Sequence, residues 1–375
     1  MTQARAHSIF PPSSMHRLVN CPGSFALTKL YPERDDSPAS MEGTAAHWVC
    51  VELLHGRRVD VGVLAPNGIA VTDEMIDGAE MYVATVPAEL IEPTMYCHVE
   101  QPVKIPRVHA ECWGTSDIWW LERSTIHVTD YKFGHGYVDE YMNDQLIAYV
   151  AGILDYLGMS DADTYVKFTI VQPRCFHRDG PVRTWACLAS DLRERIGQMR
   201  DAAERALRGD GECVTGAWCN HCPAAHACEA LQRSTQGVFD FTAAPVPSEL
   251  PPYAKGLYLR RVQQAMVLLK SIEGGLEEEI EASIRSGVAI PGYELQSGQG
   301  RTGWSKPNAE VAALGDMLGA NFRKEAFITP KQAQDMLKKM GIDGAVIGAY
   351  SEHKSGALKL VQSDMSKLKR VFQSQ

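Results

Sequence analysis

Three strand-like segments follow one another between residues 97 and 133 with no helical pattern between them. They read CHVEQPV, CWGTSDIWWL and IHVTDYKF, and their Val, Ile and Trp content favours extended structure. Helical spacing of apolar residues precedes them in EGTAAHWVCVELLHG and follows them from about Val138 to Leu157. TYVKFTIVQP and VRTWACL then predict two more strands. The order of helix, three strands, helix and strand indicates a mixed α/β core and excludes a repeated βαβ array.

The character of the chain changes after about Ser234, where a proline-bearing connector precedes one long helical pattern. We therefore expect two domains among the 375 residues, which are 45% hydrophobic and can bury a sizeable core. Residues 1–234 would form the α/β core with a flanking cysteine cluster. Residues 235–375 would form a mostly helical extension with a hairpin and a small α/β end.

The first residues, MTQARAHSIFPPSS, lack the apolar stretch of a secretion signal, and no later run is apolar enough to span a bilayer. We expect a cytoplasmic protein with no membrane partner. In a reducing compartment the ten cysteines favour free thiols or metal binding over disulfides. The net charge of -9 does not exclude nucleic acid as a partner, because carboxylates that hold divalent cations add negative charge themselves.

The stretch GTSDIWWLERSTIHVTDYKFG, residues 114–134, carries polar residues inside two apolar strands. Asp117 at the end of one strand and Asp130 in the next would bring two carboxylates to one point, with Lys132 on the same side as Asp130. Two carboxylates suit Mg²⁺ or Mn²⁺, and a lysine beside the ion can orient water and stabilise charge on a phosphate. The alternative is a turn aspartate and a solvent-facing Asp–Lys pair.

Further polar residues lie at positions that can join this group. Gln145 and Tyr149 are four residues apart on a predicted helix and share a face. His47 lies on the predicted helix upstream, and an imidazole can ligate a metal. The ordered set of His47, Gly114 to Asp117, Asp130 to Lys132 and Gln145 to Tyr149 resembles the PD-(D/E)XK nuclease superfamily, specifically its RecB-like branch.

This resemblance implies a restriction-endonuclease-like core and a role for each matching residue. Asp117 and Asp130 would bind the metal together with the Tyr131 carbonyl, and Lys132 would be the catalytic lysine. His47 would be an additional metal ligand, whereas Gln145 and Tyr149 would support the site and contact DNA. Glu100 falls where the first strand of such enzymes often carries a glutamate.

A second group of candidate ligands is the C-x₂-C-x₅-C set of Cys219, Cys222 and Cys228. The fourth ligand is open between Cys213, which would make a local Zn²⁺ site, and the distant Cys21; His221 and His226 are spare candidates. RecB-like nucleases such as the AddB nuclease domain and the CRISPR-associated adaptation exonucleases hold a 4Fe-4S cluster with one cysteine before the core and this triplet after it. The resemblance thus implies Cys21 as the fourth ligand and a structural cluster.

In the C-terminal region, GYELQSGQGRTGWSKP predicts a glycine-turned hairpin that exposes Arg301, Trp304 and Lys306. An aromatic ring between basic residues suits base stacking and contact with a phosphate backbone, and the alternative is an ordinary hairpin with a packed Trp. This region resembles uncharacterised phage RecB-like proteins.

The resemblance implies a metal-dependent deoxyribonuclease, and more specifically an exonuclease that serves phage or prophage DNA recombination or repair. Its partner would be DNA, with a single-strand-binding or annealing protein as a separate chain and a homo-oligomer as an open option. The alternative is a DNA-binding or scaffolding protein with an inactive nuclease fold. Intact Asp117, Asp130, Lys132 and Gln145 favour the enzyme, because a dead site has no physical reason to retain buried charge.

Overall fold

The computed structural model describes residues 8–31, 37–87, 96–243, 251–297, 302–304, 306, 308–322, 329–353 and 358–362. Its contacts divide the chain into two compact units, residues 1–276 and 277–375. The sequence placed the domain boundary at 234/235, whereas the contacts assign most of the long helix α8 (Pro252–Arg285) to the first unit. No helix within the described ranges is long and apolar enough to cross a membrane.

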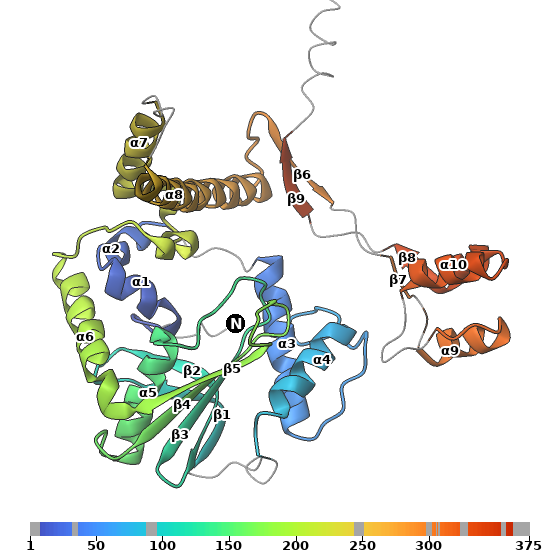
Figure 1. Ribbon diagram of the computed structural model, residues 1–375, viewed down its shortest axis with the longest axis horizontal. Coiled ribbons are helices and arrows are strands. Elements are labelled where there is room, and N and C mark those ends of the chain that lie inside the picture. Colours follow the sequence, from blue (N-terminus) through green and yellow to red (C-terminus); the bar gives the residue numbers. More distant parts are fainter. Residues whose placement is uncertain are drawn as a thin grey trace, which may run out of the picture. The chain divides into compact units, whose positions relative to one another are not determined.

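The first unit is built on one five-stranded mixed sheet (Figure 1). The strands lie in chain order, and only β3 and β4 run parallel to each other. Helix α5 (Asp144–Leu157) connects these two parallel strands. The strands are β1 Cys97–Lys104, β2 Trp113–Glu122, β3 Thr125–Tyr131, β4 Tyr165–Val171 and β5 Val182–Leu188. The mixed α/β class and the three successive strands expected from the sequence are confirmed.

Helices cover both faces of this sheet. Trp119 of β2 packs in a core with α5 and α6 (Arg193–Arg208), whereas Ile118 and Trp120 pack with α3 (Pro38–Leu54) and α4 (Asp73–Val83) on the other face (Figure 1). Burial on both faces explains why the strands read as continuous apolar runs instead of alternating ones. The remaining helices of this unit are α1 Met15–Asn20, α2 Ser24–Thr28 and α7 Glu229–Ala243.

Helix α5 begins later than the sequence pattern indicated. Asn143 is its N-cap, and its side chain accepts hydrogen bonds from the amides of Gln145 and Leu146. Residues 138–142, which the sequence pattern assigned to this helix, therefore belong to the preceding loop. The helix packs so closely on β1 that a methyl group at Gly152 would collide with the carbonyl of Lys104.

The second unit contains two small two-stranded sheets. β6 (Tyr293–Ser297) pairs with β9 (Leu358–Gln362), and β7 (Thr302–Trp304) pairs with β8 (Ser351–His353). The predicted hairpin between β6 and β7 is therefore wrong, because each strand finds its partner near the C-terminus. Helices α9 (Asn308–Met317) and α10 (Pro330–Lys339) share a core, and α10 begins with a capping box formed by Thr329 and Gln332.

Candidate metal centre and cysteine cluster

Three potential metal ligands converge from α3, β1 and β2. One ligand atom each from His47, Glu100 and Asp117 lies within 4.8 Å of the other two, and His47 Nδ1 is 3.5 Å from Asp117 Oδ2. Asp117 lies in the middle of β2, not at the strand end that the sequence suggested. An imidazole and two carboxylates form a donor set that fits a divalent cation.

Glu100 has an unusual backbone conformation that turns it toward this group. The pairing of β1 with β2 skips Glu100, although its neighbours Val99 and Gln101 pair with Ile118 and Ser116. Its φ of 48° is uncommon for a residue other than glycine, and such strain concentrates at functional sites. Burial, together with the charges of Asp117 and Asp130, raises the pKa of Glu100 to about 8. A bound cation would relieve this repulsion between carboxylates.

The second part of the site is a triangle of Asp130, Lys132 and Gln145. Lys132 Nζ donates to Asp130 Oδ1 at 3.1 Å and to Gln145 Oε1 at 3.2 Å. Gln145 Nε2 donates to the same Asp130 oxygen at 3.1 Å. Gln145 holds this position because the Asn143 cap fixes the first turn of α5.

Asp130 is almost fully buried, with 3% of its surface exposed. Its Oδ2 lies 2.9 Å from Lys132 Nζ as an ion pair, but it accepts no hydrogen bond of good geometry from the described residues. A buried carboxylate oxygen without a hydrogen bond is costly unless another partner satisfies it. Asp130 is not among the residues whose ligand atoms lie within 4.8 Å of one another, which are His47, Glu100 and Asp117. Its role as a further metal ligand stays a prediction.

The charge of Asp117 in the metal-ligand group affects the pKa values of Asp130 and Lys132 in the triangle. Burial raises the pKa of Asp130, Lys132 opposes this effect, and Asp117 adds to it. Burial alone would lower the pKa of Lys132, but Asp130 and Asp117 outweigh it and raise that pKa. Lys132 is therefore an ammonium ion at neutral pH, which donates hydrogen bonds and does not take up a proton.

The backbone around Asp117 is held by contacts from both neighbouring strands and α5. Asp117 Oδ2 accepts a hydrogen bond from the Tyr131 amide at 2.7 Å, and Tyr149 Oη donates to the Thr115 carbonyl at 2.5 Å. Gly114 has no room for a side chain, because a Cβ there would collide with Pro12 and crowd Tyr149. Tyr149 is only 4% exposed, which suits support of the site. Its contact with DNA and the ligand role of the Tyr131 carbonyl stay predictions.

An anchoring network behind Gln145 was missed by the sequence reasoning. The buried Asp144 accepts two hydrogen bonds from Arg195, at 2.6 and 2.7 Å, and lies 2.9 Å from His16 Nδ1. This network, which we call the Asp144 clamp, joins α1, α5 and α6. Its members are far apart in sequence, so the only available signal was a carboxylate in the first turn of an apolar helix.

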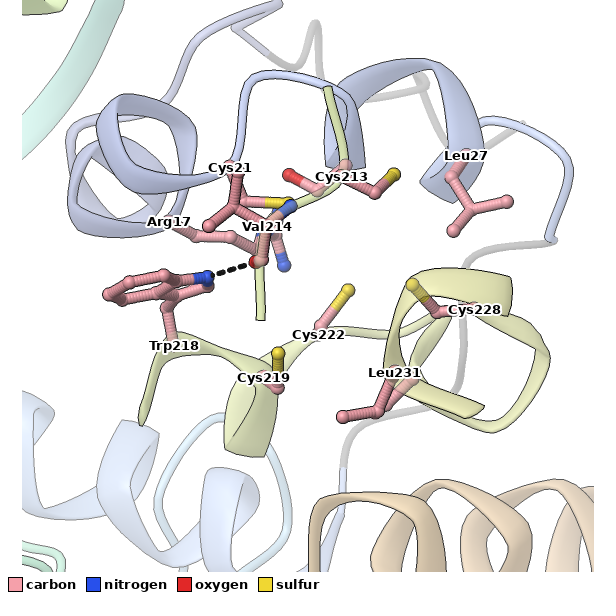
Figure 2. Close-up of a pocket in the computed structure, with 12 residues that line it drawn as sticks. Arg17, Cys21, Leu27, Cys213, Val214, Trp218, Cys219, Cys222, Cys228 and Leu231 are labelled. Carbon is pink, nitrogen blue, oxygen red and sulfur yellow. Dashed lines mark hydrogen bonds between the residues drawn. The ribbon is translucent and has the colours of Figure 1, made fainter. Parts of the chain in front are cut away.

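Five cysteines line one pocket in the first unit (Figure 2). They are Cys21, Cys213, Cys219, Cys222 and Cys228. The structure therefore brings together both of the residues between which the sequence left the fourth ligand open. In Figure 2 the thiols of Cys219, Cys222 and Cys228 point toward the segments that carry Cys21 and Cys213.

Close backbone contact brings Cys21 and Cys213 together. The Gly23 amide donates to the Glu212 carbonyl at 3.0 Å, and a Cβ on Gly23 or Gly211 would collide with the opposite backbone. The thiol of Cys21 accepts a hydrogen bond from the Val214 amide at 3.3 Å. Burial and the neighbouring Cys21 and Cys228 raise the pKa of Cys213 to about 12. Without a metal, this thiol stays protonated.

The residues proposed for DNA contact in the C-terminal region are less completely described. Arg301 lies outside the described residues, Trp304 is the last residue of β7 and its side chain is not described, and Lys306 is exposed. The structure therefore places only the Lys306 side chain, and their DNA-binding role stays a prediction.

A family model described as "Protein of unknown function (DUF2800)" matches residues 7–367. A solved structure titled "Crystal structure of SSO0001" is similar over 61% of this chain and 90% of that chain, at 11% sequence identity and a TM-score of 0.30. A likeness at that TM-score carries no weight for fold or function. Because the family match covers most of the sequence, the chain belongs to the DUF2800 family.

Proposed function

We propose that this protein is a metal-dependent DNA nuclease with a PD-(D/E)XK core of the RecB-like branch. The observation that carries the proposal is the joint position of the metal-ligand group and the lysine triangle. His47, Glu100 and Asp117 lie within reach of one cation, and Asp117 Oδ2 accepts a hydrogen bond of 2.7 Å from the amide of Tyr131, the residue between Asp130 and Lys132. These residues come from three strands and the two helices that the resemblance requires.

His47, Glu100, Asp117 and Asp130 would hold Mg²⁺ or Mn²⁺, which when bound supplies Lewis acidity at the phosphate and a more acidic water. Lys132 is charged and lies between Asp130 and Gln145, so it can donate hydrogen bonds to the attacking water or to a phosphate oxygen. Hydrolysis forms one bond from water oxygen to phosphorus and breaks the bond to the leaving sugar oxygen. Gln145 and Asp130 keep the ammonium group of Lys132 in place during this exchange.

The cysteine pocket favours an iron–sulfur cluster over a single zinc ion. Four sulfurs bound to zinc at about 2.3 Å in a tetrahedron are about 3.8 Å apart. The described residues contain no cysteine set among the groups of three or more ligand atoms that lie within 4.8 Å of one another. Ligation by thiolates alone suits a 4Fe-4S cluster held by Cys21 and the Cys219, Cys222, Cys228 triplet, with Cys213 as the competing fourth ligand.

The catalytic proposal is tested with linear end-labelled DNA and Mn²⁺. Lys132→Ala should lower the cleavage rate by at least about 100-fold, because it removes a positioned positive charge from the phosphate. Lys104→Ala, at an exposed position near the end of β1, is the matched control and should cut like the unmodified protein. Undiminished cleavage by folded Lys132→Ala would rule out this site, whereas DNA binding without cleavage by the unmodified protein would favour the inactive-fold alternative.

A further inference from the structure

Two loops beside Lys132 form one structural unit. Strands β3 and β4 are parallel, so the loops that follow them, residues 132–143 and 172–181, leave the same edge of the sheet. The buried Gln172 joins them, because its Nε2 donates to the carbonyls of Gly134 at 3.0 Å and Gly136 at 2.6 Å. Its Oε1 accepts from the Val138 amide at 3.2 Å. We call this unit the paired loops.

Arg174 anchors the paired loops to α3, which carries His47, and to α4. Its guanidinium lies 3.7 Å from the ring centre of Phe133 and forms ion pairs of 2.8 Å with Glu42 of α3 and Glu74 of α4. The Arg174 carbonyl lies 3.2 Å from His135 Nδ1. The loops are therefore held from several sides, and their outward side chains are presented on a fixed backbone.

Aromatic side chains stand on the outside of this fixed backbone. Phe176 is 98% exposed, and the adjacent His177 stacks on Tyr137 with ring centres 5.0 Å apart and planes at 19°. Tyr137 and Tyr141 are also exposed. Single exposed apolar residues are common, but an exposed Phe176 next to the stacked His177–Tyr137 pair, on two joined loops one of which begins with Lys132, offers flat surfaces to a substrate.

Charge does not dominate this surface. Arg174 is paired with two glutamates, and Arg183, which lies 4.9 Å from the Tyr137 ring centre, is paired with Glu140 at 3.1 Å. The exposed Arg178 is 3.5 Å from Asp179. Few cations are thus left for phosphates, so the surface suits recognition of bases. Bases are accessible for stacking in single strands and are enclosed in a duplex.

We propose that the paired loops bind unpaired bases of single-stranded DNA by stacking, with Phe176 as one platform and the His177–Tyr137 pair as the other. This inference rests on the proposed nuclease function and gives it a substrate class, namely a single strand or an unpaired end. Stacking is tolerant of sequence because every base has a flat face, so little base preference is expected.

The test measures binding of the full-length protein to a labelled single-stranded oligonucleotide by fluorescence anisotropy in EDTA, so that no cleavage occurs. Phe176→Ala should weaken this binding by about 5- to 100-fold, and Phe176→Trp should retain it. Tyr165→Ala, which removes an exposed aromatic ring at the opposite end of β4, is the matched control and should bind normally. On a strand of the same length with abasic sites, which offers no base to either platform, the unmodified protein should bind at least as weakly as Phe176→Ala binds the intact strand.

Single-strand binding by Phe176→Ala equal to that of the unmodified protein would overturn the proposal. An equal loss of affinity for a single strand and for a blunt duplex would also overturn the proposal, because it would indicate that Phe176 contacts the sugar-phosphate backbone of DNA. Cleavage assays separate the two proposals. A protein that cuts DNA but binds it independently of Phe176 refutes only the stacking surface, whereas Phe176-dependent binding without any cleavage refutes only the nuclease.

Discussion

Glu100 combines a strained backbone with a proton that the metal must displace. Its pKa rises from an ordinary 4.5 to about 8 because burial and the charges of Asp117 and Asp130 disfavour its anion. Cation binding requires the anion, so affinity for Mn²⁺ should increase with pH until about pH 8. Glu100 was also the least distinctive of the site residues that the sequence suggested, because a single glutamate in a strand matches no motif.

The raised pKa also predicts how the metal-free protein responds to pH. Between about pH 4.5 and 8 the folded state binds a proton at Glu100 that the unfolded state has released, so rising pH lowers the free energy of unfolding. Urea unfolding in EDTA at several pH values should show this slope, and Glu100→Gln should reduce it. Saturating Mn²⁺ should reverse the loss at pH 8. An identical slope in Glu100→Gln would place the responsible group elsewhere.

At the scale of elements, the Asp144 clamp ties the helix of Gln145 to the helix that ends beside Cys21. Burial opposes the Asp144 anion, but hydrogen bonds from His16 and Arg195 outweigh it and lower the Asp144 pKa below 3.8. The clamp therefore stabilises the fold above about pH 4 and loses this contribution as pH falls through the lowered pKa. Asp144→Ala should cost about 3 kcal/mol at neutral pH.

The clamp predicts a coupling that can be measured separately from stability. Asp144→Ala should lower the cleavage rate under conditions where it remains folded, since Gln145 and Lys132 lose their fixed helix end. Arg193→Ala is a suitable control, because Arg193 pairs with Asp161 on the exposed side of the same region. A variant that is less stable but cuts at the normal rate would limit the clamp to a structural role.

Helix α5 also shows how closely the elements pack. Gly152→Ala should destabilise the protein by about 1–3 kcal/mol, because the added methyl group meets the Lys104 carbonyl and strained packing of this kind has that cost. Gly197→Ala on α6 has open space around it and should be neutral or stabilise the helix by up to about 1 kcal/mol. Equal effects of the two changes in thermal unfolding would contradict the close approach of α5 to β1.

Local sequence patterns predicted the helices and strands better than they predicted which strands pair and which side chains meet. Strands β1 to β3 and helix α5 were predictable because apolar periodicity and short connections are local. The predicted pairing of β6 with β7 was wrong because glycines suggested a turn, whereas pairing with β9 and β8 depends on residues about 50 to 70 positions away. For the same reason a lone carboxylate in the first turn of α5 was the one local signal of the Asp144 clamp, and spacing alone could not choose between Cys21 and Cys213.

At the scale of the whole molecule, the candidate site and the cysteine pocket belong to the first unit. A fragment that ends after Ser286 keeps α8 whole and contains every residue of both groups. It should fold, retain the cluster and cut DNA in a metal-dependent way. Loss of the visible cluster spectrum in this fragment would show that residues 287–375 contribute to the first unit.

The most direct test of the central claim is degradation of linear end-labelled DNA by anaerobically purified protein, with Mn²⁺ and with EDTA. The proposed site predicts loss of full-length DNA with Mn²⁺ and none with EDTA, and Asp117→Asn should need far more Mn²⁺ or fail to cut. Folded protein that binds the DNA and leaves it intact at every Mn²⁺ concentration would contradict a nuclease.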